Sequence, residues 1–358
     1  MRITDYYARP RTAKYGGVNT SRIELLKALE RFSDAEITII NAKNGFQTEE
    51  TPGIRRTELP HLFSNHVVMI PVGIVSFVRN ADYVFLHEGW NLGNAYVALC
   101  CRLFRTPYII IPHGVYDPNI VSNLRYRLGR EIIESFVLRN AHFVNIFFKC
   151  EEKHINNIAV KAKTVIAPTG ISKRIYNYKW KGSGDYLYYA GRLDVNHKGL
   201  DILVKAFAKI DTGHKLVLQG QNFFGGVDVL KALISDLNLT EKVKILPHAS
   251  HHEIMKMTEQ CVAFVHISRW ESYGRSVVDA LSIGAPTLIS RSMNISTTQD
   301  AEKVFEIVEL QEQYVIDGIN RLLEKCRKNY SDANLRSAWI KDSFNWEKTV
   351  EILLSHLH

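Results

Sequence analysis

Short apolar runs alternate with amphipathic segments along the whole chain. In the first half, runs rich in β-branched and aromatic residues predict strands near residues 2–7, 37–41, 83–88, 107–111, 142–148 and 164–167. In the second half, the same pattern predicts strands near residues 186–190, 215–219, 243–246, 262–268, 286–290 and 304–308. Strands separated by helices are typical of parallel sheets that are covered on both faces. The pattern therefore predicts an α/β fold with two Rossmann-like domains facing a cleft.

The length of the chain also fits two domains. Its 358 residues are enough for two domains of ordinary size. A Lys-, Gly- and Ser-rich stretch at residues 177–184 separates the two series of strands, and such composition is typical of a boundary. We therefore expect one domain over residues 1–176 and another over residues 177–344.

The most informative stretch is residues 262–290, VAFVHISRWESYGRSVVDALSIGAPTLIS. It predicts a strand, a polar loop with Glu271, a helix over residues 276–283 with Asp279, and another strand. Amides at a helix N-terminus favour an anionic ligand, and carboxylates accept hydrogen bonds from hydroxyls. The stretch therefore suits a ligand with a sugar, a phosphate and a ribose. The alternative is that Glu271 is a solvated loop acid and Asp279 a surface residue of the helix. The predicted ligand-binding backbone is at Tyr273, Gly274, Arg275 and Ser276.

A second stretch carries two cations after a predicted strand. Arg192 and Lys198 lie six residues apart in the loop between that strand and the next helix. Two cations near a helix N-terminus can hold a diphosphate and neutralise it as a leaving group, and the alternative is a solvated cationic loop. Gly191 and Gly220 each follow a predicted strand, where a ligand can approach the backbone closely.

The first half offers weaker candidates at the ends of its strands. Gly16 and Gly17 follow the first strand, and Ser21 with Glu24 fits a capping box that opens a helix over residues 22–30. This turn is either an anion site or simply a tight turn.

Two histidines in the first half also follow predicted strands. His87 and His113 lie where open α/β sheets bind ligands, although a structural role is the alternative for each.

Taken together, these motifs resemble those of the retaining glycosyltransferases of family 4, which have the GT-B fold. The resemblance lies in Gly191-Arg192-Leu with Lys198-Gly, in Glu271-x7-Asp279, and in a strand that ends at His113. It implies that Arg192 and Lys198 hold the donor diphosphate, that Glu271 and His113 contact the donor sugar, and that Asp279 contacts the ribose. The family usually has Glu where this chain has Asp279.

The resemblance also implies a function and an arrangement of domains. We expect transfer of a sugar from a nucleotide-sugar donor, with UDP favoured, to an acceptor hydroxyl with retention of configuration. The expected acceptor is a saccharide or lipid-linked saccharide in polysaccharide or glycolipid biosynthesis. Residues 1–176 would be the acceptor-side domain, residues 177–344 the nucleotide-sugar-binding domain, and the C-terminal helix, within residues 345–358, would cross back to the first. The resemblance also implies no cofactor and no essential metal, and the absence of any Asp-x-Asp from the sequence agrees with this.

The net charge of +8 is concentrated in the first half of the chain. Residues 1–175 hold 23 Lys and Arg against 15 Asp and Glu, whereas residues 176–358 hold 22 of each. The excess fits an anionic membrane surface or a lipid-phosphate acceptor, with scattered solvated charge as the alternative. A basic amphipathic segment at residues 124–138, with Arg125, Arg127 and Arg130, could contact lipid headgroups or be an ordinary surface helix. No nucleic-acid motif accompanies the charge, so no nucleic-acid partner is expected.

Composition indicates the compartment. The five cysteines form no Cys-x-x-Cys pair, which favours a reducing environment and no zinc site. The three histidines at positions 248, 251 and 252 have no Cys nearby in sequence, and a surface loop of this kind predicts no metal site. The longest apolar run, residues 67–78, is shorter than the roughly 20 residues of a spanning helix and predicts a core helix. No signal peptide is predicted, so we expect a cytoplasmic protein, either free or peripheral on the inner face of the cell membrane.

Other functions remain compatible with the motifs. A sugar-nucleotide epimerase would turn over the donor alone, and a phosphorylase would carry a pyridoxal group. A non-catalytic sugar-nucleotide-binding protein would bind the donor without turnover, and the shorter Asp279 fits that alternative.

Overall fold

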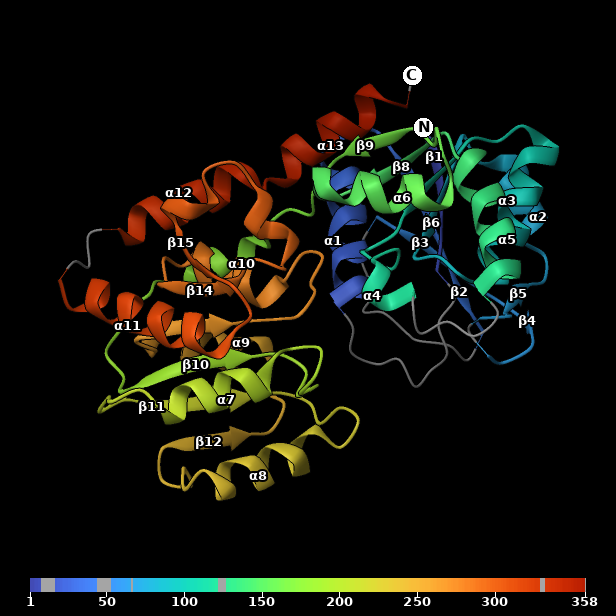
Figure 1. Ribbon diagram of the computed structural model, residues 1–358. Coiled ribbons are helices and arrows are strands. Elements are labelled where there is room, and N and C mark those ends of the chain that lie inside the picture. Colours follow the sequence, from blue (N-terminus) through green and yellow to red (C-terminus); the bar gives the residue numbers. More distant parts are fainter. Residues whose placement is uncertain (8–16, 44–52, 66, 122–126, 329–331, 358) are drawn as a thin grey trace. The chain divides into compact units, whose positions relative to one another are not determined.

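The chain forms two compact units. The computed structural model describes all residues except 8–16, 44–52, 66, 122–126, 329–331 and 358. The first unit comprises residues 1–170 and 346–358, and the second comprises residues 171–345 (Figure 1).

The first unit is built on a seven-stranded parallel sheet. Its strand order is β3-β2-β1-β6-β7-β8-β9. The strands are β1 (Arg2–Tyr6), β2 (Glu36–Ala42), β3 (Arg55–Leu59), β6 (Tyr83–His87), β7 (Tyr108–Ile111), β8 (Phe143–Ile146) and β9 (Thr164–Ile166). A small antiparallel pair lies apart from this sheet, formed by β4 (His61–Leu62) and β5 (Ile70–Pro71).

Helices connect the strands of the first unit. The C-terminal helix α13 belongs to this unit and packs against α1, although more than 300 residues separate them in the chain. The described helices are α1 (Gly17–Phe32), α2 (Ile74–Asn80), α3 (Leu92–Phe104), α4 (Pro118–Val121), α5 (Arg127–Arg139), α6 (Glu152–Ile158) and α13 (Trp346–Ser355).

The second unit repeats the architecture with a six-stranded parallel sheet, in the order β12-β11-β10-β13-β14-β15. Its strands are β10 (Tyr186–Ala190), β11 (Lys215–Gln219), β12 (Val243–Leu246), β13 (Ala263–His266), β14 (Thr287–Ser290) and β15 (Phe305–Val308). Its helices are α7 (Leu200–Ala208), α8 (Gly226–Asp236), α9 (His251–Gln260), α10 (Arg275–Ser282), α11 (Glu312–Lys328) and α12 (Ala333–Ser343).

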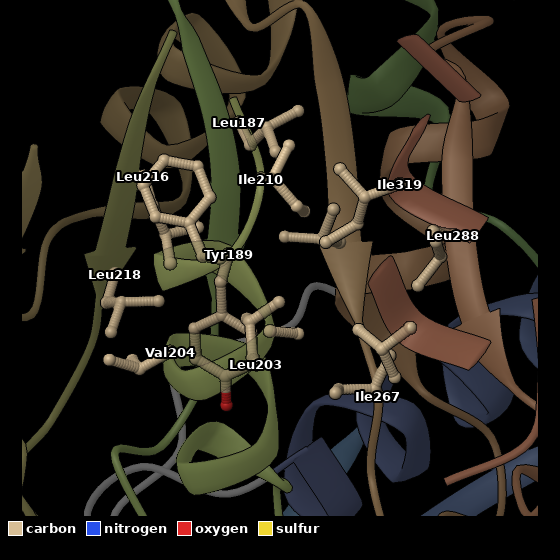
Figure 2. Packing of buried hydrophobic residues seen from close by; sticks show 14 of the residues in the cluster. Leu187, Tyr189, Leu203, Val204, Ile210, Leu216, Leu218, Ile267, Leu288 and Ile319 are labelled. Carbon is tan, nitrogen blue, oxygen red and sulfur yellow. The ribbon is translucent and has the colours of Figure 1, made fainter. Parts of the chain in front are cut away.

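One hydrophobic core of the second unit lies between its sheet and the helices on one face. Figure 2 shows Leu187 and Tyr189 of β10 packed with Leu203 of α7. Full burial of one such Leu side chain contributes roughly 1.5–3 kcal/mol. Because the core holds β10, β11 and β13 in register, it also fixes where the loops after these strands begin.

The predicted α/β fold is confirmed, with two parallel sheets and covering helices. Each of the twelve predicted strands is present, with ends shifted by three residues or fewer. The prediction missed β3, whose sequence RRTEL is mostly polar because it forms the edge of its sheet.

Two local predictions were wrong, and a third stretch is well ordered. Helix α1 begins at Gly17, so Ser21 lies inside the helix and is buried rather than capping it. The apolar run at residues 67–78 contains β5 and only the first part of α2, because Pro71 and Gly73 interrupt it. The stretch at residues 177–184 packs on the second unit, where Trp180 donates its backbone N–H to Ile283 O (2.9 Å) and its indole N–H to Cys261 O (2.7 Å).

Across the described part of the chain, every helix is too short or too polar to cross a bilayer.

Candidate functional site

The loops after β10 and β11 approach each other closely in the second unit. Gly191 donates its N–H to Gln219 O at 3.0 Å. A Cβ atom added to Gly220 would lie 1.6 Å from Gly191 O, so a side chain at position 220 would force the two strand ends apart. Arg192 is exposed, and its guanidinium lies 4.7 Å from the centre of the Phe223 ring. This cation–π contact orients Arg192 while it remains accessible.

Lys198 and Glu271 form a largely buried ion pair, with side chains 7% and 20% exposed. Lys198 is 6% exposed, and its ammonium contacts the carboxylate of Glu271 in the loop after β13. Gly199, at φ 62°, then starts α7. Although burial favours the neutral acid, Lys198 and His266 hold the pKa of Glu271 well below its usual range. Glu271 therefore stays a carboxylate beside Lys198.

His266 ends β13 and lies beside this pair. Its ring stacks on Tyr189 with 5.0 Å between ring centres, and its Nε2 is 3.7 Å from the carboxylate of Glu271. Nε2 is one of the buried side-chain atoms without a hydrogen-bond partner in the described residues. Such atoms are rare and often mark a functional site. The sequence prediction missed His266, although a polar residue that closes the apolar run VAFVH was a usable signal.

The N-terminus of α10 follows Glu271 directly. Gly274 has φ 67°, and its carbonyl accepts hydrogen bonds from Val277 (2.9 Å) and Val278 (3.1 Å). The intrahelical hydrogen bonds therefore begin at Val277, and the amides of Arg275 and Ser276 lie at the positive end of the helix dipole. The ring of Tyr273 is buried against Phe344, with 5.5 Å between ring centres, so its side chain serves packing.

Asp279 is the fifth residue of α10 and is paired with a histidine. His251 at the start of α9 contacts the Asp279 carboxylate through Nε2 at 3.0 Å. The Asp279 side chain is 13% exposed, against 46% for His251. Ser250 and Glu253 form a capping box that fixes where α9 begins. No group of three or more potential metal ligands lies close together in the described ranges.

The first unit holds a separate buried network at the carboxyl ends of its strands. Asp5 of β1 is fully buried, and Arg22 of α1 contacts one of its carboxylate oxygens. The other oxygen is 2.6 Å from Nε2 of His87, at the end of β6. Nδ1 of His87 is in turn 3.0 Å from Nε2 of His113, which follows β7. The sequence prediction considered the two histidines separately and missed Asp5 and Arg22.

Burial and charge set the ionisation of this network. Although burial favours the neutral acid, Arg22 and His87 lower the pKa of Asp5 below its ordinary value. Burial and the neighbouring His87 hold the pKa of His113 well below its ordinary value. Asp5 is therefore a carboxylate and His113 a neutral imidazole near pH 7.

The loops that carry these histidines have unusual backbone conformations. His113, Glu88 and Trp90 all have φ between 54° and 61°, which costs energy for residues with a side chain. Glu134 of α5 contacts both loops. It accepts a hydrogen bond from the Trp90 N–H (2.8 Å) in the loop after β6, and another from the Tyr116 hydroxyl in the loop after β7. Burial raises the pKa of Glu134 to about 7.

The structure brings together only some of the predicted site residues. Lys198 contacts Glu271; Arg192, Gly220 and Asp279 lie in the same unit, and His113 lies in the other. Gly17 is the exposed first residue of α1. Gly16 and Arg125 lie outside the described residues, as does the side chain of Arg127.

Comparison with known proteins gives a consistent result. Residues 175–346 match the family described as Glycosyl transferases group 1. A GDP-mannose:cellobiosyl-diphosphopolyprenol alpha-mannosyltransferase of Xanthomonas oryzae is 23% identical over 223 residues, which are 61% of this chain. The aligned region spans 58% of the length of that relative.

Solved structures resemble the whole chain. Sucrose-phosphate synthase from Thermosynechococcus elongatus has a TM-score of 0.79 at 18% identity, covering 99% of this chain and 97% of that one. Anabaena HepE in complex with UDP also has a TM-score of 0.79, at 17% identity and 99% coverage of both chains. The fold is therefore GT-B, as predicted, and the sequence matches support a glycosyltransferase.

Proposed function

We propose that this protein is a retaining, metal-independent glycosyltransferase that transfers a sugar from a nucleotide-sugar donor to an acceptor hydroxyl. The observation that carries the proposal is the buried ion pair of Lys198 and Glu271. It lies in the part of the chain that matches the glycosyl transferase family and at the carboxyl ends of parallel strands. Open α/β sheets bind ligands at this edge.

Each residue of the site has a proposed role in binding the donor. Lys198 and Arg192 neutralise the diphosphate as the glycosidic bond breaks. Glu271 accepts hydrogen bonds from hydroxyls of the donor sugar, and the amides of Gly274, Arg275 and Ser276 bind phosphate and sugar oxygens at the positive end of α10. Gly191 and Gly220 let the donor approach the backbone closely.

The proposed ribose contact is Asp279, and its pairing with His251 determines which carboxylate oxygen can bind the ribose. Because His251 contacts one carboxylate oxygen of Asp279, the other oxygen is the one available to a ribose hydroxyl. Asp is one methylene shorter than the Glu that the family usually has, so a bridging water would complete the contact.

We propose a UDP-sugar as the donor, and the experiment includes GDP-mannose because one relative is named for it. The structure of HepE with UDP supports a uridine nucleotide. Thermal-shift measurements with UDP-, GDP- and ADP-sugars should show one nucleotide that raises the melting temperature. At 100 times the Kd, binding stabilises the folded state by about 2.7 kcal/mol.

Product analysis then tests the chemistry. With the stabilising donor and a lipid-linked saccharide, NMR of the product should show the anomeric configuration of the donor, and EDTA should not reduce the rate. Absence of stabilisation by every donor would refute the proposal. Turnover of the donor without acceptor would instead favour an epimerase.

We also propose that the protein works in the cytoplasm at the inner face of an anionic membrane, where its acceptor is a lipid-linked saccharide. Helix α3 supports this proposal because it exposes apolar side chains on one stripe: Leu92 (36%), Leu99 (55%) and Leu103 (73%). These positions recur at helical spacing, so they share a face. No Asp or Glu occurs between Glu88 and Asp117.

Arginines flank this apolar stripe. Arg79 lies over the Phe104 ring at 5.4 Å, and Arg102 lies over the Phe136 ring at 5.9 Å. Helix α5 adds Ile132, which is 74% exposed. Ile132 has Glu131 beside it, so the acid-free part of this surface is α3. Exposed apolar side chains flanked by cations are typical of a surface that binds anionic lipid.

Substitution of the apolar stripe is expected to weaken membrane binding. Leu99→Glu with Leu103→Glu should reduce cosedimentation with phosphatidylglycerol-containing vesicles at least about tenfold, because it adds two negative charges to a surface that faces anionic lipid. Leu335→Glu is a matched control, since Leu335 is 53% exposed but lies on α12 of the other unit. Equal loss in both variants, or binding that is insensitive to anionic lipid and salt, would contradict the membrane proposal.

A further inference from the structure

Four side chains of the first unit form a continuous chain of polar contacts. The order is Arg22 of α1, Asp5 of β1, His87 of β6 and His113 after β7. Nε2 of His87 lies 2.6 Å from the Asp5 carboxylate, and Nδ1 of His87 lies 3.0 Å from Nε2 of His113. The Tyr7 ring lies roughly perpendicular to the His87 ring, at 5.9 Å between ring centres. Because each group has a limited set of donors and acceptors, the protons in this chain can be placed.

The carboxylate at the start of the chain fixes the first proton. Arg22 only donates hydrogen bonds, and Asp5 as a carboxylate only accepts them. Nε2 of His87 must therefore carry a hydrogen that it donates to Asp5. In a neutral His87, Nδ1 is then a lone pair. Such a lone pair must accept from Nε2–H of His113, 3.0 Å away.

The remaining nitrogen of His113 is left as an acceptor. His113 keeps part of its surface exposed, and the Phe147 ring lies edge-on against it at 5.5 Å. Within the described ranges, no hydrogen bond is made by Nδ1 of His113, whereas its Nε2 is occupied by His87. Nδ1 is therefore the nitrogen of His113 that is left to accept from a ligand.

We propose that Asp5 and His87 are positioning residues that hold His113 as its Nε2–H tautomer, so that Nδ1 accepts a hydrogen bond from a substrate hydroxyl. The identity of the substrate as a saccharide rests on the proposed function. The tautomer itself rests only on the geometry of the first unit, so the two can fail separately. The strained backbone of His113, at φ 54°, is consistent with a side chain that the network holds in place.

Acid reverses the hydrogen-bonding role of His113. If His113 gains a proton, its Nδ1 carries a hydrogen. The acceptor is then lost, while the charged groups that face the two histidines, Asp5 and Arg22, stay in place. Hydroxyl binding at His113 is therefore expected to weaken as the pH falls.

Nitrogen NMR of the full-length protein labelled at histidine tests the proposal. Signals of His113 and His87 can be assigned by their loss in His113→Gln and His87→Phe. We expect the wild type at pH 7.5 to show His113 with hydrogen on Nε2 and a lone pair on Nδ1. Observation of the Nδ1–H tautomer would overturn the proposal, whether or not the protein transfers sugar.

Asp5→Asn gives the sharpest comparison. Because Arg22 only donates, the carbonyl oxygen of the introduced amide must face Arg22 and its nitrogen must face His87. That nitrogen donates, so His87 must accept at Nε2 and donate from Nδ1, which forces His113 into its Nδ1–H tautomer. An unchanged His113 tautomer in Asp5→Asn would overturn the proposal. Asp82→Asn is the matched control, since Asp82 pairs with Arg2 on the surface of the same unit.

A second variant covers the case in which Asp5→Asn fails to fold. His87→Phe keeps an aromatic ring and leaves Asp5 paired with Arg22, but removes the partner of His113. We expect a mixture of His113 tautomers and a kcat for sugar transfer that falls about 10- to 100-fold. His87→Asn, whose side-chain oxygen can replace the Nδ1 acceptor, should restore the Nε2–H tautomer. A single, unchanged tautomer in His87→Phe would contradict the proposal, and a wild type without transferase activity would refute only the proposed function.

Discussion

Lys198→Ala is expected to lower kcat/KM for sugar transfer by about 10²–10³-fold, which is the usual effect of removing one group that stabilises developing charge. The proposed role of Lys198 is to neutralise the departing diphosphate, so its loss should raise the barrier of the chemical step. Donor binding should weaken as well, because the ground-state diphosphate contacts the same ammonium. The measurement is steady-state kinetics with the donor that stabilises the wild type.

The buried position of Lys198 makes a stability control necessary. Its substitution leaves the carboxylate of Glu271, which is 20% exposed, without its cation. A fully buried unpaired charge costs about 3–5 kcal/mol, so the loss of stability should stay below that range. Lys198→Met combined with Glu271→Gln removes both charges and should recover most of the stability. It should not recover transfer, because the cation is still absent.

A surface pair in the same unit supplies the negative control. Lys209 contacts Glu312 at 2.6 Å, but its side chain is 66% exposed, and exposed pairs contribute about 0–1 kcal/mol. Lys209→Ala should therefore leave transfer and stability close to wild type. If the Lys198→Met/Glu271→Gln double variant transfers sugar within about tenfold of the wild-type rate, Lys198 does not stabilise the leaving group.

The sequence predicted those parts of the molecule that local patterns determine. Strands buried on both faces appear as apolar runs, so the strands around β10 and β13 were found almost to the residue. Arg192 and Lys198 were recognisable because the loop after one strand places them close together in sequence. The edge strand β3 was not predicted, because its polar residues form no apolar run.

Contacts between distant segments could not be predicted in this way. Lys198 and Glu271 are 73 residues apart, and Asp5 and His87 are 82 residues apart. Each pair forms because parallel strands bring their carboxyl ends to one edge of a sheet. A single acid inside the strand RITDY was the available signal for Asp5, since an acid buried in a strand needs a partner. Nothing local identifies Arg22 as that partner.

The stability of the first unit is expected to depend on the buried pair of Arg22 and Asp5. Arg22→Met should lower the free energy of unfolding by about 3–5 kcal/mol at pH 7, because it leaves the Asp5 carboxylate buried without its main cation. Both side chains of this pair are 0% exposed, whereas those of the Arg2–Asp82 pair are 58% and 42% exposed. Arg2→Met is therefore the matched control and should change stability by no more than about 1 kcal/mol. Urea unfolding of the two variants and the wild type measures both effects.

The pH dependence of the difference in stability between wild type and Arg22→Met identifies the cause of that difference. The pKa of Asp5 is lower in the folded protein than its ordinary value, so the carboxylate stabilises the folded state fully above the unfolded-state pKa of about 4. As the pH falls below that value, the unfolded chain takes up a proton before the folded one, and the stabilisation decreases until the pH passes the lowered pKa. In Arg22→Met, burial without the cation raises the pKa of Asp5 instead, so this variant gains less from ionisation at neutral pH. The gap between wild type and Arg22→Met should therefore narrow on acidification, whereas a gap that stays constant with pH would show that lost packing of the Arg22 side chain, and not its charge, is responsible.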